Sequence, residues 1–268
     1  MKKATLIRIA TWISAAAMSG ALVYIGFYTY EALNRRSLDR QIHELYYALP
    51  PYAVPLLNMP KNTDESSDAE ELPAPQPSQY ERLQPFLEIN PDFVAIIKIP
   101  GTDMVLPIVH GTDNVKYLDT SFEGTRSKHG ALFLDSGNNG QFTDPNNVLY
   151  GHNMNDGTML RGIMAYQNMS HYEEAPIIEL DGLHGTDTWL IFAAYVCEPT
   201  FPYFYTHFPD GFFSQILDEI QRRSVIRTGV DVNEDDILLT LSTCAYDFDN
   251  ARFAVHARLL RDGEELSQ

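Results

Sequence analysis

The segment LLTLSTC (238–244) ends an apolar run on a thiol, and RFAVHARLL (252–260) restarts on an arginine after an acidic turn. A free cysteine at the end of a strand is often only packed, because cysteine is among the most buried residue types. A thiolate is the reactive form of cysteine, however, and a nearby cation stabilises it. Arginine stays protonated, so Arg252 would bind a developing oxyanion and would not move protons. Cys244 and Arg252 together indicate nucleophilic chemistry if the two runs are neighbours.

Alternation along the two runs predicts neighbouring antiparallel strands. In the first run Leu239, Leu241 and Thr243 share one face, and Cys244 lies on the other with the even-numbered residues. If the runs pair, the last residue of the first strand faces the first residue of the second, with the strands about 4.8 Å apart. We therefore expect Cys244 and Arg252 together at one rim of a sheet.

Proton transfer needs a third group, and one of the eight histidines is well placed for it. The apolar strand NVLY ends at Gly151, and His152 opens the polar loop HNMNDGT, so its imidazole is predicted at a strand end, where sites are commonly built. An ordinary surface or core histidine is the alternative reading. That reading is expected for the other seven, including His256 on the strand face of Arg252.

The elements that must position these side chains are mostly short strands rich in β-branched and aromatic residues and bounded by Gly, Pro, Asn and Asp. Eight such strands suggest a closed barrel. Two helices are predicted, near 158–167 and over 211–223, and the apolar stripe of the second is expected to be core and not a cofactor site. The predicted strands are 93–100, 105–109, 130–135, 147–151, 176–180, 188–196, 236–244 and 252–260.

The first thirty residues differ from the rest. Ile9 to Tyr30 carries no charge and is about long enough to cross a bilayer. We expect an uncleaved membrane anchor; a cleaved signal peptide and a buried helix are the alternatives. Basic residues flank the run on both sides, so the positive-inside rule does not orient it.

Downstream of this run, residues 31–49 have the spacing of an amphipathic helix, and 58–79 is rich in Pro, Ser and acidic residues, which predicts a flexible spacer. The predicted layout is an anchor over 1–30, a helical stalk and linker over 31–79, and a globular domain over 80–268.

Composition excludes some classes of function. The formal net charge is −17, which argues against a broad nucleic-acid-binding face, while 44% hydrophobic residues suffice for a large core. The two cysteines allow at most one disulfide, which would need Cα atoms within about 7 Å. Cys197, in the apolar run WLIFAAYVC, is expected to fill the core.

The motifs together resemble a known family. TLSTC followed by ARF, with LYGHN about ninety residues upstream and an apolar N-terminal run, resembles a class B sortase over roughly 86–261. The helix at 211–223 resembles the additional helix that class B members carry between the sixth and seventh strands. DNVKYL (113–118) resembles a segment beside the substrate groove, which implicates Asn114 and Leu118 in substrate binding.

The resemblance implies a mainly β fold, a closed eight-stranded sortase-type barrel, and a transpeptidase that needs no cofactor or metal. Cys244 would be the nucleophile that forms a thioacyl enzyme. His152 would be the general acid and base, and Arg252 would hold the substrate carbonyl and its oxyanion. Ser242 and Thr243 would add hydrogen bonds to the substrate.

It also implies a single-pass protein with a cytoplasmic N-terminus and an extracellular domain, as on Gram-positive cells. The partners would be surface proteins with an Asn-Pro-x-Thr-like sorting signal and a peptidoglycan amine as acceptor; a pilin lysine is the alternative acceptor. Two other readings stay open. One is a different Cys–His peptidase or acyltransferase, in which Asn153 or Asp156 would orient the histidine. The other is a non-catalytic, membrane-anchored binding or adhesion module with a packed Cys244.

Overall fold

A computed structural model describes residues 2–50, 77–209 and 211–266. The chain divides into two compact units, Met1–Glu44 and Leu45–Gln268. Helix α1 (Lys2–Ala48) runs without a break through the predicted anchor and the predicted amphipathic segment. Its stretch Arg8–Tyr30 has a mean hydropathy of 1.5 and no buried side chains within its unit, so its length and composition suit a membrane span or a signal sequence.

The spacer predicted for 58–79 lies outside the described residues up to position 76. The described chain then forms helix α2 (Gln79–Ile89), which our sequence analysis did not predict. A capping box begins it, because the Ser78 hydroxyl accepts from the Glu81 amide and the Glu81 carboxylate accepts from the Ser78 amide. The domain limits proposed from sequence stay predictions.

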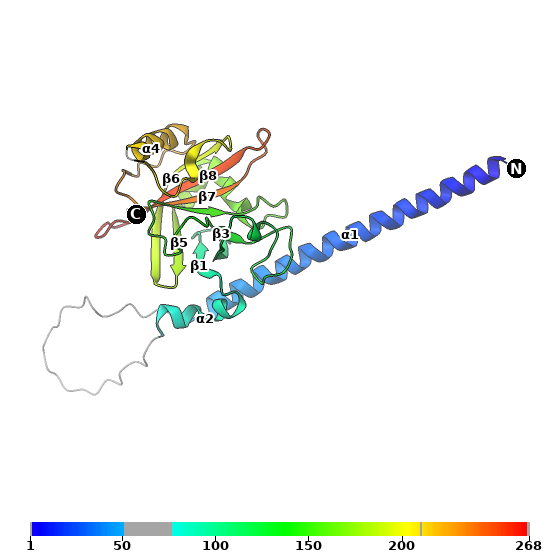
Figure 1. The fold of residues 1–268 in the computed structure, drawn as a ribbon, viewed down its shortest axis with the longest axis horizontal. Helices are drawn as coiled ribbons and strands as arrows, with labels where there is room; N and C mark the ends of the chain where they lie inside the picture. The colour runs from blue at the N-terminus through cyan, green and yellow to red at the C-terminus, as the bar shows by residue number, and fades with distance from the viewer. Residues whose placement is uncertain (1, 51–76, 210, 267–268) are drawn as a thin grey trace, which may run out of the picture. The chain divides into compact units, whose positions relative to one another are not determined.

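Eight strands form a closed barrel in the order β1-β2-β3-β4-β7-β8-β6-β5, which confirms the predicted fold class (Figure 1). Each predicted strand is present, with ends shifted by a few residues. The strands are β1 (Phe93–Lys98), β2 (Val105–His110), β3 (Leu132–Leu134), β4 (Asn146–Tyr150), β5 (Ile177–Gly182), β6 (Gly185–Cys197), β7 (Leu238–Cys244) and β8 (Arg252–Leu259).

Alternation along β7 divides its side chains between two apolar cores. Leu239 and Leu241 point into the barrel interior, where Trp189 and Val255 are also buried. Leu238 points outward to a second core beneath helix α4 (Phe212–Arg223), which packs on β6. The buried stripe of α4, which comprises Phe213, Ile216, Leu217 and Ile220, belongs to this outer core, as predicted from its periodicity.

Short helices occupy the connections between strands. They are η2 (Lys116–Leu118), η3 (Leu160–Gln167), α3 (Met169–Glu174) and η4 (Pro202–Phe204). The predicted helix at 158–167 is therefore a 3-10 helix that begins at Leu160.

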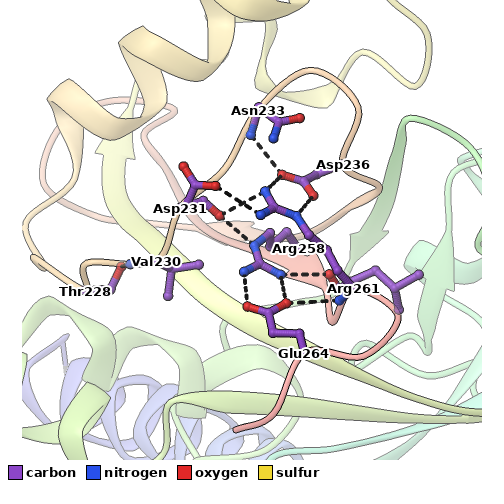
Figure 2. Close-up of polar contacts among 9 residues, drawn as sticks. Thr228, Val230, Asp231, Asn233, Asp236, Arg258, Arg261 and Glu264 are labelled. Carbon is purple, nitrogen blue, oxygen red and sulfur yellow. Dashed lines mark hydrogen bonds and ion pairs between the residues drawn. The ribbon is translucent and has the colours of Figure 1, made fainter. Parts of the chain in front are cut away.

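Charged side chains cluster near the end of β8 (Figure 2). Arg258 is only 2% exposed, and its guanidinium forms two hydrogen bonds with the carboxylate of Glu264. Arg261 binds both carboxylate oxygens of Asp236 at 2.7 Å and reaches Asp231 at 3.0 Å. The two arginines are thus fully paired with acids, and they tie the residues after β8 to the segment before β7.

Candidate active site

Strand topology brings the three predicted catalytic residues to one rim of the barrel. β4 and β7 are parallel neighbours with Tyr150 opposite Ser242, so the residues that follow the two strands emerge at the same end. His152 therefore lies level with Cys244. β7 and β8 are antiparallel, with Cys244 directly opposite Arg252 in register. The predicted pairing of these strands is confirmed.

The two cysteines differ in exposure. Both are free thiols; Cys244 is partly exposed at the rim, whereas Cys197 is 1% exposed. Burial raises the pKa of the Cys197 thiol to about 12, so it stays protonated at neutral pH. Cys197 packs in the outer core, as expected.

Arg252 lies opposite Cys244, and its described hydrogen bonds go to backbone carbonyls. Its Nη1 donates to the backbone carbonyls of Asn250 and Ala251 at 3.0 and 3.1 Å. Among the side chains that the structure describes, no carboxylate lies within 4.0 Å of this guanidinium. A permanent cation beside the thiol can therefore stabilise negative charge that develops on a substrate oxygen.

His152 is held by a backbone carbonyl and not by an acidic side chain. Its Nε2 lies 2.7 Å from the carbonyl oxygen of Leu118. A carbonyl only accepts, so Nε2 carries a hydrogen, and Nδ1 is the basic nitrogen of the neutral ring. Asp156 pairs with the buried His129 at 2.8 Å, and Asn153 bonds to the Cys244 carbonyl. Neither side chain considered as an orienting group thus bonds to the His152 ring.

A cavity of about 460 Å³ opens at this rim and is lined by all seven site residues that the family resemblance implied, but not by Asn153 or Asp156. Its lining also includes residues that sequence reasoning missed, because they come from segments whose place depends on the barrel. The lining residues are Asn114, Leu118, Phe133, Asp135, Tyr150, Gly151, His152, Tyr203, Phe204, Ser242, Thr243, Cys244 and Arg252.

The hydroxyls next to the thiol already have partners in the protein. Ser242 Oγ lies 2.8 Å from the Tyr203 hydroxyl, and Thr243 Oγ1 donates to the Gly151 carbonyl at 2.7 Å. The Thr243 bond fastens the start of the His152 loop to β7. Direct contact of these two hydroxyls with substrate stays a prediction.

A cluster of hydrogen-bonded polar side chains also lines the cavity. Asp135 accepts from Asn114 Nδ2 and from the Tyr150 hydroxyl, both at 2.9 Å, and Asn114 Oδ1 accepts from the Ser136 amide at 2.8 Å. Burial, followed by the Asp135 charge, raises the pKa of Tyr150, which stays a neutral donor. The Asn114 amide therefore presents a fixed orientation to the cavity.

The rim thus combines a thiol, an imidazole and a guanidinium around one cavity. This set can break an amide bond by acyl transfer to sulfur. In the described ranges, no group of three or more His, Cys, Asp or Glu is placed to hold a metal ion.

Comparison with known proteins assigns the class. A model of the sortase domain matches residues 97–260. Sortase B of Staphylococcus aureus is 36% identical over 186 residues, which is 68% of this chain and 75% of that protein. The chain belongs to the sortase family of cysteine transpeptidases, and within it to the sortase B group.

Solved structures agree with this assignment. A Staphylococcus aureus sortase B–substrate complex matches with a TM-score of 0.64 and 34% identity, over 68% of this chain and 86% of that one. A structure of sortase B complexed with triglycine matches with a TM-score of 0.63 and 34% identity, over the same shares of the two chains.

Proposed function

We propose that this protein is a membrane-anchored sortase B that cleaves a sorting signal of a surface protein and joins the protein to a peptidoglycan amine. Cys244 is the nucleophile, His152 the general acid and base, and Arg252 the oxyanion ligand. The observation that carries the proposal is the convergence of these three residues on one cavity, with the cation unpaired among the described residues.

In the acylation step, the thiol proton passes to His152 Nδ1 and the Cys244 sulfur attacks the carbonyl carbon of the scissile peptide bond. The new C–S bond leaves the carbonyl oxygen negative, where Arg252 stabilises it. When this intermediate collapses, the C–N bond breaks and His152 returns the proton to the departing nitrogen. The product is a thioacyl enzyme.

In the second step, an acceptor amine attacks the thioacyl carbon and gives a proton to His152. The C–S bond breaks, and the sulfur regains its proton as the new amide is released. The same imidazole therefore accepts a proton and returns it in each of the two steps, which suits a ring held through Nε2 by Leu118.

The loop after β7 supports an amine acceptor. Tyr246, Asp247, Phe248 and Asp249 are exposed and begin two residues after Cys244, so two exposed carboxylates lie within five residues of the thiol in the sequence. Negative charge attracts an ammonium group, and one similar sortase B has been crystallised with triglycine. We propose a glycine-type amine of peptidoglycan as the acceptor; transfer to a lysine side chain would indicate pilin joining.

The apolar stretch of α1 supports a membrane anchor. Arg8–Tyr30 is long enough to span a bilayer, and the substrates proposed here lie outside the cell. We therefore place the N-terminus in the cytoplasm and the barrel outside. Retention of α1 in the mature protein, measured by mass spectrometry of the purified membrane fraction, tests the anchor against a cleaved signal.

The test is turnover of fluorogenic peptides that vary around an Asn-Pro-x-Thr core, with the full chain in detergent micelles and with triglycine or a lysine peptide as acceptor. We expect cleavage, a thioacyl adduct on Cys244 by mass spectrometry, and transfer to triglycine. Cys244→Ala should abolish all three. Turnover that survives this substitution, or a Cys244 that no thiol reagent labels before denaturation, would overturn the proposal and favour a binding module.

A further inference from the structure

The residue after His152 contacts the nucleophile's own backbone. Asn153 is 5% exposed, and its Nδ2 donates to the Cys244 carbonyl at 2.7 Å. Its Oδ1 accepts from Arg161 Nη1 at 3.0 Å. The proton carrier and the nucleophile, far apart in the chain, are thus joined by one side-chain amide.

Two more bonds join the same segments. Thr243 Oγ1 donates to the Gly151 carbonyl at 2.7 Å, and the Tyr246 hydroxyl donates to the Asn153 carbonyl at 3.3 Å. These bonds flank the Asn153 contact on either side. Within the described chain, the Asn153 bond is the side-chain hydrogen bond made to the Cys244 backbone itself.

Arg161 fixes the orientation of the Asn153 side-chain amide. A guanidinium only donates, so it must face the amide oxygen, and the amide NH₂ is then turned toward the Cys244 carbonyl. The opposite orientation would place two oxygens against each other. Arg161 has no carboxylate partner within 4.0 Å among the residues described, so this contact is not a by-product of an ion pair.

We propose that Asn153 is a positioning residue for transpeptidation, oriented by Arg161, that sets the separation of the His152 imidazole from the Cys244 thiol. The inference rests on the proposed function. Proton transfer between the two groups depends on their alignment, and a misplacement of about 1 Å can cost about a hundredfold in rate. The substrate cavity does not include Asn153 or Arg161, so substrate binding should be largely independent of both.

The first test replaces the amide by a group of the same shape that cannot donate. In Asn153→Asp, the carboxylate still binds Arg161, which favours folding, but it turns an oxygen toward the Cys244 carbonyl. We expect kcat for sorting-peptide cleavage to fall about ten- to a hundredfold, with KM within twofold of the parent. The control is Asn155→Asp, the same change in the same loop at an exposed residue without a described side-chain bond, which should leave kcat unchanged.

A second pair of variants tests the orienting role and is safe from folding failure, because Arg161 is exposed. Arg161→Met should lower kcat about three- to tenfold, and Arg161→Lys, which keeps a donor for Asn153 Oδ1, should restore most of it. The concentration of active enzyme is taken from titration of the Cys244 thiol, so loss of folded protein does not count as loss of kcat.

The outcomes separate the two proposals. If Cys244→Ala is inactive but Asn153→Asp keeps the parent kcat, or changes only KM, the positioning role is wrong and the transpeptidase proposal stands. Equal losses in Arg161→Lys and Arg161→Met would also overturn the orienting role. If Cys244→Ala remains active, the proposed function fails first.

Discussion

The two ends of strand β8 carry arginines in opposite situations. Arg252 begins the strand beside Cys244, and no carboxylate pairs with it among the described residues. Arg258, six residues later on the same face, is buried and bound bidentately by Glu264 (Figure 2). The same side chain thus serves two purposes on one strand.

The difference shows how the environment decides what a cation does. A guanidinium whose charge is already neutralised at short range can only hold structure together. One that bonds only to backbone carbonyls keeps its field available for a transient oxyanion. The sequence separates Arg252 from Arg258 only by its place at the strand end; the partners that the structure gives them decide what each charge can do.

The largest effect is expected at the unpaired end. Arg252→Met should lower kcat/KM for sorting peptides about a hundred- to a thousandfold, the cost of losing one oxyanion ligand. The melting temperature should change little, because Arg252 forms no ion pair with the residues that the structure describes. A variant that loses stability but keeps activity would reverse the roles assigned to the two ends.

Replacing Arg258, at the paired end of β8, should lower stability and leave activity nearly unchanged. Arg258→Met breaks a largely buried ion pair and should lower the free energy of unfolding by about 2 to 4 kcal/mol, measured by urea denaturation. Activity per titrated thiol should stay within about twofold. Arg222→Met, which removes an exposed arginine from a surface pair with Glu219, is the matched control and should cost at most about 1 kcal/mol.

Between the two arginines, His256 predicts a pH effect. The Thr240 hydroxyl donates to Asn146, so it accepts from His256 Nδ1–H, and Nε2 accepts from the Tyr195 hydroxyl. This buried neutral ring has its pKa lowered to about 3 by burial. The unfolded chain, with a histidine pKa near 6.5, binds the proton first, so stability is lost as the pH falls below about 6.5.

We expect a loss of about 2 kcal/mol from this residue between pH 7 and pH 5, before the carboxylates titrate. In His256→Gln the pH dependence in that range should flatten, whereas His184→Gln, at an exposed histidine, should retain it. Equal slopes in the parent and in both variants would contradict the assignment.

The smallest effect concerns the thiol on the other side of Arg252. Iodoacetamide should label Cys244 in the folded protein and Cys197 only after denaturation, because Cys197 is buried with its pKa raised to about 12. Cys197→Ala should cost about 1 kcal/mol of stability and leave kcat within twofold. Rapid labelling of Cys197 in the native protein would show that the rim is more open than described.

The sequence predicted the strands well because their signals are local. Alternation and β-branched residues mark β7 and β8, and their short connection fixes which residues face each other. Helix α2 was missed because its Ser78-x-x-Glu81 cap follows a Pro-rich run and Pro85 lies inside the helix.

The candidate site also has a part that the local sequence predicts and a part that it does not. Cys244, His152 and Arg252 stand at strand ends, which a pattern can locate. The contacts around them depend on pairing between distant segments. No local sequence signal predicts that the Leu118 carbonyl contacts His152 or that Tyr203 contacts Ser242. Nor does one predict that the Asn153 side chain donates to the Cys244 carbonyl.

Arg252 is also a spacer, since the register sets Cys197 on one side of it and Cys244 on the other. Cys197 and Cys244 lie two strand intervals of about 4.8 Å apart, so their Cα atoms are farther apart than the roughly 7 Å that a disulfide can span. Cys244 therefore cannot form a disulfide with Cys197 while the barrel is folded. Both its distance from Cys244 and its protonated thiol therefore keep Cys197 from reacting with Cys244.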